Sequence, residues 1–313
     1  MTMFTKRKNE LGIAIEEVAG TPVAPTHYIP FLDCTLNNKI EIISDEQAKG
    51  TRFGEGSDSI IGKKSGEGKI EVVLDPTTAP YWFALAMGSI VSEAKGQQFA
   101  HTCTLSDSNE PLTATIWRNI GIDTVQFSNS VISSFEMSFA DNVAKLSMDI
   151  ISKSGTTQSR TSSLTTDLEL FTFKNATVTI GTTEIKVEDF KLKVDNDPES
   201  LYAPGDNDVD RIAVKTPKIT GSFKLVLESD DQYDAYNGLE KQALSIEFEG
   251  ATDTIEINLP QIRIDGWSED GGNDDLAREA IDFVVEESDE SGEEIPMTVV
   301  ITNSVEEYAP AES

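Results

Sequence analysis

The chain has 313 residues and a formal net charge of −30, from 55 acidic and 25 basic side chains. A field of that sign repels nucleic acid and anionic membranes, and binding to duplex DNA by charge neutralisation needs clustered Lys and Arg. Hydrophobic residues make up 38% of the chain. That content excludes a disordered chain and leaves room for one large or two mid-sized domains.

The N-terminal residues MTMFTKRKNELG are basic, but no apolar run of useful length follows them. No other stretch approaches the roughly 18 apolar residues of a membrane-spanning helix, so we expect neither a signal peptide nor a transmembrane span. Cys34 and Cys103 are the only cysteines. Two thiols make no disulfide framework, which fits folding in a reducing cytoplasm.

The next segment, GIAIEEVAGTPVAPTHYIPF from Gly12 to Phe31, is punctuated by proline and glycine. Proline removes backbone donors and stiffens the chain. We therefore expect an extended arm that docks on another subunit and does not pair within its own core. The alternative is an ordinary frayed N-terminus.

Alternating apolar and polar residues dominate the rest of the chain and predict half-buried strands. The predicted strands are Lys69–Leu74, Thr113–Trp117, Ser133–Ala140, Ala144–Ser152, Thr183–Val194, Ser222–Leu227, Leu244–Gly250, Asp253–Leu259 and Ala280–Glu286. Two short helices are expected, in APYWFALAMG and SDDQYDAYNGLEK, each ending near a glycine. The sequence predicts a mainly β protein.

An internal repeat organises these elements. GKIEVVLDPTTAPYWFALAMG at Gly68 is echoed 153 residues later by GSFKLVLESDDQYDAYNGLEK at Gly221, and upstream Ile40 and Ile42 match Leu192 and Val194 at a spacing of 152. Long polar loops, Ser44–Gly68 and Asp195–Thr220, precede the repeated strands. We predict two tandem β-sandwich or barrel domains, each with a short helix and a long inter-strand loop.

A Ser/Thr-rich run near residue 160 marks the boundary between the two copies. The expected divisions are an extended arm, a first β domain, a linker, a second β domain and a C-terminal tail, at residues 1–28, 29–155, 156–167, 168–304 and 305–313.

Little in the sequence indicates catalysis or metal binding. His27, Cys34, His101 and Cys103 could be combined into a zinc site, but their spacing matches no common finger and ordinary buried side chains are the stronger interpretation. The acidic runs Asp206–Asp210 and Glu269–Asp275 lack the ligand spacing of an EF-hand. No P-loop, dinucleotide fingerprint or nucleophile elbow occurs. We expect no cofactor, no metal and no enzymatic activity.

The opening segment, with Glu16, Gly20, Thr21, Pro25 and then Ile29, Pro30 and Phe31, resembles the phage tail tube protein family of long-tailed bacteriophages. The polar loop followed by GKIEVVLDPTTAPYWFALAMG is similar to the same family. The resemblance implies a structural virion protein, assembled in the host cytoplasm, whose subunits form stacked rings. It further implies that a tube conducts DNA without binding it specifically, that sheets of neighbours join into a barrel, and that tape-measure and terminator or baseplate proteins are partners.

Many members of that family carry one tube domain and form six-membered rings. A duplicated subunit implies a trimeric ring with pseudo-sixfold symmetry, with a hexamer as the alternative. A conduit should not bind the polyanion it conducts, because each basic contact to phosphate adds affinity. We therefore expect a negatively charged lumen, and alternation nominates the strand-borne acids Glu136, Asp149, Glu247, Glu249 and Glu256.

Two other functions stay open from sequence. A virion decoration protein or a surface β-sandwich binding module would also be β-rich and acidic, although the absence of a signal peptide argues against secretion. An enzyme is the weakest alternative, because no preorganised polar constellation is visible.

Overall fold

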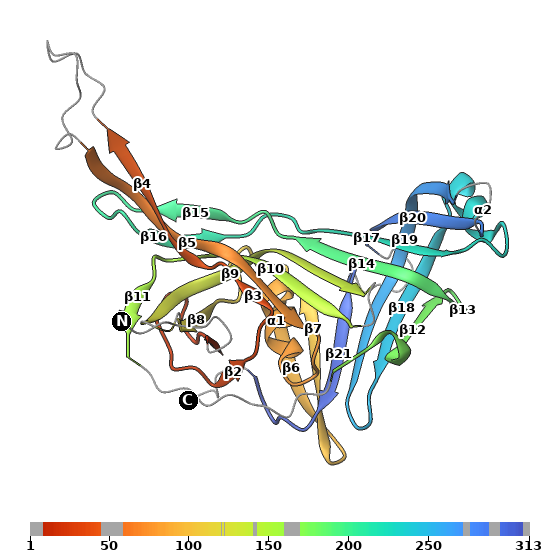
Figure 1. Ribbon diagram of the computed structural model, residues 1–313, viewed down its shortest axis with the longest axis horizontal. Coiled ribbons are helices and arrows are strands. Elements are labelled where there is room, and N and C mark those ends of the chain that lie inside the picture. Colours follow the sequence, from red (N-terminus) through yellow and green to blue (C-terminus); the bar gives the residue numbers. More distant parts are fainter. Residues whose placement is uncertain are drawn as a thin grey trace, which may run out of the picture.

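The computed structural model describes residues 9–44, 59–119, 121, 123–139, 143–159, 170–271, 276–287 and 295–308. Within these ranges the protein is mainly β, as predicted, and it has two α-helices, α1 (Ala79–Met87) and α2 (Asp231–Gly238) (Figure 1). Neither is long and apolar enough to cross a membrane.

We call residues 9–159 the N-terminal unit and residues 170–308 the C-terminal unit. The strands of the N-terminal unit are β1 (Glu10–Ile15), β2 (His27–Ile29), β3 (Asp33–Cys34), β4 (Asn37–Ser44), β5 (Ser59–Val73), β6 (Gly88–Lys95), β7 (Gln98–Leu105), β8 (Ala114–Asn119), β9 (Thr124–Phe139), β10 (Lys145–Ser152) and β11 (Thr156–Gln158). Those of the C-terminal unit are β12 (Ala176–Ile180), β13 (Thr183–Ile185), β14 (Val187–Asp195), β15 (Glu199–Tyr202), β16 (Val209–Ala213), β17 (Lys218–Val226), β18 (Lys241–Glu249), β19 (Thr254–Asp270), β20 (Arg278–Val285) and β21 (Thr298–Asn303).

One continuous antiparallel sheet runs through both units, in the order β4–β5–β10–β9–β14–β17–β20–β19. We call it the long sheet. Its strands alternate between buried apolar residues and polar ones, the pattern of a sheet with one solvated face. The polar face, which points away from α1, is called the open face.

The strand order repeats between the units. In the N-terminal unit β9 continues from the long sheet into a second sheet, β2–β1–β8–β9–β11. In the C-terminal unit β19 does the same, in the order β13–β12–β18–β19–β21. The long, bent strands β9 and β19 thus hold equivalent places, and so do α1 and α2.

Each unit also carries an element that the other lacks in that form. The β6–β7 hairpin belongs to the N-terminal unit alone, and it pairs with β21 of the C-terminal unit through β7. The β15–β16 hairpin of the C-terminal unit lies across the N-terminal unit, where Val209 and Ile212 pack on Val131. The two units are therefore joined at several places.

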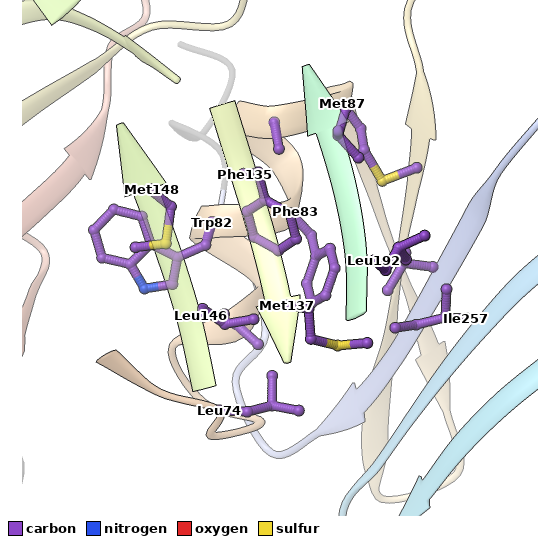
Figure 2. Close-up of a cluster of buried hydrophobic side chains, with 14 of the residues drawn as sticks. Leu74, Trp82, Phe83, Met87, Phe135, Met137, Leu146, Met148, Leu192 and Ile257 are labelled. Carbon is purple, nitrogen blue, oxygen red and sulfur yellow. The ribbon is translucent and has the colours of Figure 1, made fainter. Parts of the chain in front are cut away.

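The core lies between the long sheet and the second sheets. The side chains of Trp82 and Phe83 from α1 pack among Phe135, Met137, Leu146 and Met148 of the long sheet, with Leu192 and Ile257 close by (Figure 2). All nine residues of α1 are buried. Truncation of such aromatic residues to alanine typically costs about 3–5 kcal/mol.

Local sequence ends both helices. Gly88 has φ 87° and its N–H bonds to Ala84 O, a left-handed cap that glycine adopts without steric cost. Leu239 takes the same position in α2 with φ 51°. Both predicted helices are confirmed.

Several expectations require correction. The segment expected as an arm forms β1 and β2, which pair with each other and with β8, so it pairs within its own chain. Its alternation, with Leu11, Ile13 and Ile15 buried, favours this sheet despite the prolines that follow. The tail from residue 305 is also packed in part, because Tyr308 is buried and donates to Thr77 O at 2.8 Å.

The expected loops and the upstream register also differ from the structure. β5 begins at Ser59, inside the expected Ser44–Gly68 loop, of which residues 45–58 lie outside the described ranges. β15 and β16 form within Asp195–Thr220. Pairing places Cys34 opposite Ile70 as Phe190 lies opposite Phe223, so Leu36, and not Ile40, corresponds to Leu192. Most of the expected linker lies outside the described residues.

Candidate functional site

The joint between the units is a complete antiparallel strand pairing. β9 and β14 share six residue pairs, from Phe139 opposite Phe190 to Ser134 opposite Asp195. On the buried face the rings of Phe139 and Phe190 stack with centroids 5.2 Å apart. At its end Asn196 Nδ2 donates to Ala86 O and Ile132 O at 2.9 and 3.1 Å. Two equivalent units can thus join edge to edge through sheet and core together.

The corresponding outer edges of the long sheet pair with no further strand among the described residues, although Arg118 donates to Cys34 O and Leu36 O at one of them. At one end β4 pairs with β5 only. At the other end the last part of β19, from Ile264 to Asp270, pairs with β20 only, since β18 and β21 contact earlier residues of that strand. Exposed edges of this kind template further strand pairing. One chain therefore presents two different edges suited to head-to-tail association.

The β4–β5 hairpin projects from the molecule (Figure 1). Its large apolar side chains are exposed, with Ile42 and Ile60 each more than 60% accessible; the set is Ile40, Ile42, Ile43, Ile60 and Ile61. Ile42 lies opposite Ile61 and Ile43 opposite Ile60, so both faces of the hairpin are apolar. A cluster of exposed large apolar side chains is typical of an interaction site.

The five acids predicted to face a lumen lie on two different surfaces. Glu136 and Asp149 are on the open face of the long sheet, opposite Ser147 and Ser134 respectively. Glu247, Glu249 and Glu256 lie on β18 and β19 in the second sheet, and Glu247 is opposite Glu256. The two sheets pack face to face, as the Phe139–Phe248 ring contact shows. The structure does not bring the five acids together.

The open face carries far more basic residues than the composition of the chain implies. Strand register places these bases on it: Lys69, Lys145, Lys191, Lys193, Lys218, Lys224, Arg263 and Arg278. The acids on the same rows are Asp33, Glu67, Glu71, Glu136, Asp149, Asp189, Asp195, Asp270 and Asp282. The two signs are nearly balanced there. The alternating lysines of KLKV and KITGSFKL are the sequence signal that could have revealed this.

Salt bridges fix several of these bases. Lys193 Nζ lies 3.0 Å from Asp195 Oδ2, and Lys224 pairs with Asp270. Arg263 contacts Asp265 and Glu286 at 2.9 and 2.7 Å, and the salt bridges with Glu286 lower the pKa of that carboxyl, opposed in part by desolvation. Paired bases offer fewer unengaged charges to a passing anion.

Glu16 has an internal role. Its carboxylate is buried and accepts four hydrogen bonds, from Gly20 N and Thr113 Oγ1 on Oε2 and from Thr115 Oγ1 and Asn129 N on Oε1. The distances run from 2.7 to 2.9 Å. A buried carboxylate is tolerated only with partners of this kind. Glu16 thus fastens the turn after β1 to β8 and β9.

Of the other residues of the expected arm, some pack against the rest of the chain and others are exposed to solvent. Gly20 has φ 78°, and Pro25 packs on Gly12, where an added Cβ would lie 2.9 Å from the proline. Phe31 packs at the rim of the core, whereas Thr21 and Pro30 are exposed. Only the exposed residues are placed to contact a neighbour.

The histidine and cysteine side chains are buried or half-buried, and the histidines form hydrogen bonds inside the protein. Burial lowers the pKa of His27, which hydrogen-bonds with Tyr81 Oη at 2.7 Å. Burial also lowers the pKa of His101, opposed in part by the hydrogen bond that its Nε2 donates to Asn303 Oδ1. Burial raises the pKa of the Cys103 thiol, and Cys34 is buried as well. No metal-binding cluster of His, Cys, Asp or Glu occurs within the described ranges.

A family model described as phage tail tube protein matches residues 6–286, nearly the whole chain. No curated protein matches the chain.

Proposed function

The chain belongs to the phage tail tube protein family and is a structural subunit of a bacteriophage tail tube, and on that premise we propose that three copies close a ring with pseudo-sixfold symmetry. The observation that carries the proposal is the β9–β14 pairing, which joins two units of equal strand order. A contact between chains that copies this joint would pair the open edge of β19 with β3 and β4 of the next chain.

The register of that contact follows from equivalent positions. In the ladders, Ile70 opposite Met148 corresponds to Phe223 opposite Ile281. Phe135, opposite Met148, then corresponds to Trp267, opposite Ile281. Transferring the β9–β14 register places Asn37 of one chain opposite Ser268 of the next.

Such a contact is head to tail, and it forms a closed ring only if the rotation between units closes. The internal joint and the contact between chains use the same edges, so the rotation per unit is nearly the same at both. Two units per chain then give six positions from three chains. A sheet edge that would be a liability in a monomer becomes the joint of the ring.

The open face of the long sheet would line the channel, because α1 and the second sheets cover the other face (Figure 1). Glu136 and Asp149 are then the members of the predicted acid set that face DNA, among nearly balanced and partly paired charges. Binding to phosphate grows with each unpaired base that releases counterions. We therefore propose that the channel lining has nearly balanced charge, and not the strong negative charge expected from the sequence. Such a lining conducts DNA without binding it.

The β4–β5 hairpin and its exposed isoleucines would connect stacked rings. Its surface is apolar on both faces and extends beyond the sheet (Figure 1). Tape-measure protein inside the tube and terminator or baseplate proteins at its ends complete the proposed set of partners, after assembly in the host cytoplasm.

A disulfide test addresses the proposed register. Paired residues in antiparallel strands have Cα atoms about 4.5–5.5 Å apart, within the range of about 4.4–6.8 Å that a disulfide spans. The Asn37→Cys/Ser268→Cys variant should form covalent dimers and trimers on mild oxidation. The control Asn37→Cys/Ser147→Cys places the second thiol in mid-sheet and should stay monomeric in denaturing gels. Equal yields from the two variants would contradict the proposed edge contact.

A further inference from the structure

The segment before β12 makes a contact at the joint between units. Val143 and Thr172 form an antiparallel bridge, and Ala144 N donates to Phe171 O at 3.2 Å. Ala144 O in turn accepts from Leu74 N at the end of β5, at 2.8 Å. The chain entering the C-terminal unit thus crosses the end of β10, beside α1 of the N-terminal unit.

The C-terminal unit has the same local frame. Leu227 N donates to Ala277 O at 3.1 Å, as Leu74 N does to Ala144 O. The equivalence of Met148 and Ile281 makes Ala277 the counterpart of Ala144, and Leu276 that of Val143. Leu276 is 59% exposed whereas its counterpart Val143 is half-buried, and Ala277 is half-buried whereas Ala144 is buried. The hydrogen bond between Leu227 N and Ala277 O is thus present in the C-terminal unit. Within the described residues, however, no segment bridges to Leu276 as Thr172 bridges to Val143.

An apolar hollow lies next to this frame. It has a volume of about 630 Å³ and is lined by Leu227, Glu228, Ser229, Asp230, Tyr233 and Trp267. Of α2 only Ala235 is buried, whereas every residue of α1 is. The helix in the N-terminal unit is covered by segments of its own chain, as the Tyr81–Tyr308 ring contact shows. The C-terminal helix has no comparable cover in the described structure.

Strand register identifies the segment that would fit. The bulges at Ala114/Ile116 and Gln242/Leu244 match, so Ile116 corresponds to Leu244. Ile13 lies opposite Ile116, and Ile180 lies opposite Leu244, so β1 corresponds to β12. By the same spacing Thr5 corresponds to Thr172. Residues 1–8, MTMFTKRK, therefore stand in relation to β1 as the crossing segment stands to β12. β1 and β8 lie at the opposite end of the molecule from α2 (Figure 1), so the occupant must come from a second copy.

The chemistry of the two surfaces is complementary. The segment combines Met1, Met3 and Phe4 with Lys6, Arg7 and Lys8, a basic cluster in a chain of net charge −30. The hollow combines apolar Leu227, Tyr233 and Trp267 with acids at its rim, namely Glu228, Asp230, Asp231 and Asp234. Attraction between such exposed charges is screened by salt.

We propose that residues 1–8 of one chain dock on the hollow between α2 and Leu276 of the preceding chain in the ring. This inference rests on the proposed function for its choice of neighbour. The docked segment forms the bridge to Leu276 that Thr172 forms to Val143, and it covers the exposed flank of α2. It adds a second contact, outside the long sheet, at each joint between chains.

The first test is a disulfide in assembled protein. A Thr5→Cys/Leu276→Cys variant should give interchain disulfides that end at a covalent trimer, because the two positions are expected to be bridge partners. The control Thr5→Cys/Leu201→Cys carries the second thiol on another exposed leucine, in β15, and should not crosslink. The native thiols are buried and should not compete. Rings that form without the Thr5–Leu276 crosslink would overturn the docking while leaving the proposed ring intact.

The second test does not depend on ring formation. A fluorescent MTMFTKRK peptide is titrated onto the chain that lacks residues 1–8. We expect saturable binding that weakens with salt and falls at least tenfold in Leu276→Glu, with Leu201→Glu unchanged. A scrambled peptide of equal charge should bind more weakly. Binding without ring formation would support the docking and refute the proposed ring. No saturable binding, or equal effects of the two glutamate variants, would overturn the docking.

Discussion

Replacing Glu16 by glutamine tests whether its buried carboxylate fastens the turn after β1. The change keeps the shape of the side chain but replaces one oxygen by an amide nitrogen. Each oxygen now accepts one backbone N–H and one hydroxyl. Whichever way the amide lies, a backbone N–H of Gly20 or Asn129 faces a donor instead of an acceptor.

The magnitude follows from these bonds. A buried donor without its acceptor costs about 1–3 kcal/mol, and the remaining bonds weaken because they lose their charged acceptor. Asn129 has φ 53°, so the loss falls on a backbone already held in the left-handed region. We expect Glu16→Gln to lower the free energy of unfolding by roughly 2–4 kcal/mol.

The assay is urea unfolding followed by far-ultraviolet circular dichroism and tryptophan fluorescence. Trp117 reports on this region, because its indole N–H donates to Val23 O at 3.1 Å. The matched control is Glu17→Gln, an exposed neighbour, for which we expect a change within about 0.5 kcal/mol. Equal unfolding midpoints for the two variants would refute the assigned role of Glu16.

Three further predictions concern packing, pH and charge. Gly221→Ala should destabilise the fold by about 1–3 kcal/mol in urea unfolding, because the new Cβ would lie 2.3 Å from the ring of Phe283; Ser222→Ala is the control, and equal midpoints would contradict the close packing. The free energy of unfolding should fall as the pH is lowered from 7.5 to 5.5. Burial lowers the pKa of His27 and His101 in the folded protein below the unfolded value of about 6.5, so the unfolded chain binds more protons. An unfolding midpoint that does not change with pH would contradict this. Glu136→Lys/Asp149→Lys should slow DNA ejection from assembled phage, whereas Glu247→Lys/Glu256→Lys, on the other sheet, should not; the reverse ranking would contradict the assignment of the open face to the channel.

Much of the fold could be predicted from local patterns. Alternation in KIEVVL and AKLSMDIIS located β5 and β10, and APYWFALAMG located α1, because burial of one sheet face or one helix imprints its period on the sequence. β1 was missed because the prolines after it outweighed the alternation of Leu11, Ile13 and Ile15. The register of the strand before β5 was also missed. Residues 35 and 36 separate β3 from β4, and each of these two strands pairs with β5.

The candidate site was harder to predict, because strand pairing between distant segments is not encoded by local periodicity. Alternation showed that Glu136 and Glu256 point away from buried neighbours, yet it could not show that they lie on different sheets. Likewise, nothing local distinguishes the open edge of β19 from the paired edge of β9. That distinction depends on which strand the chain later places beside each one.

The central claim is that one chain supplies two adjacent positions of a ring. The most direct measurement is the native mass of a ring released from the tube, compared with the 34.2 kDa mass of one chain. We expect three copies per ring, with images that show threefold symmetry and six similar lobes. A ring of six copies would contradict it, because the β9–β14 joint would then not be the template for contact between chains.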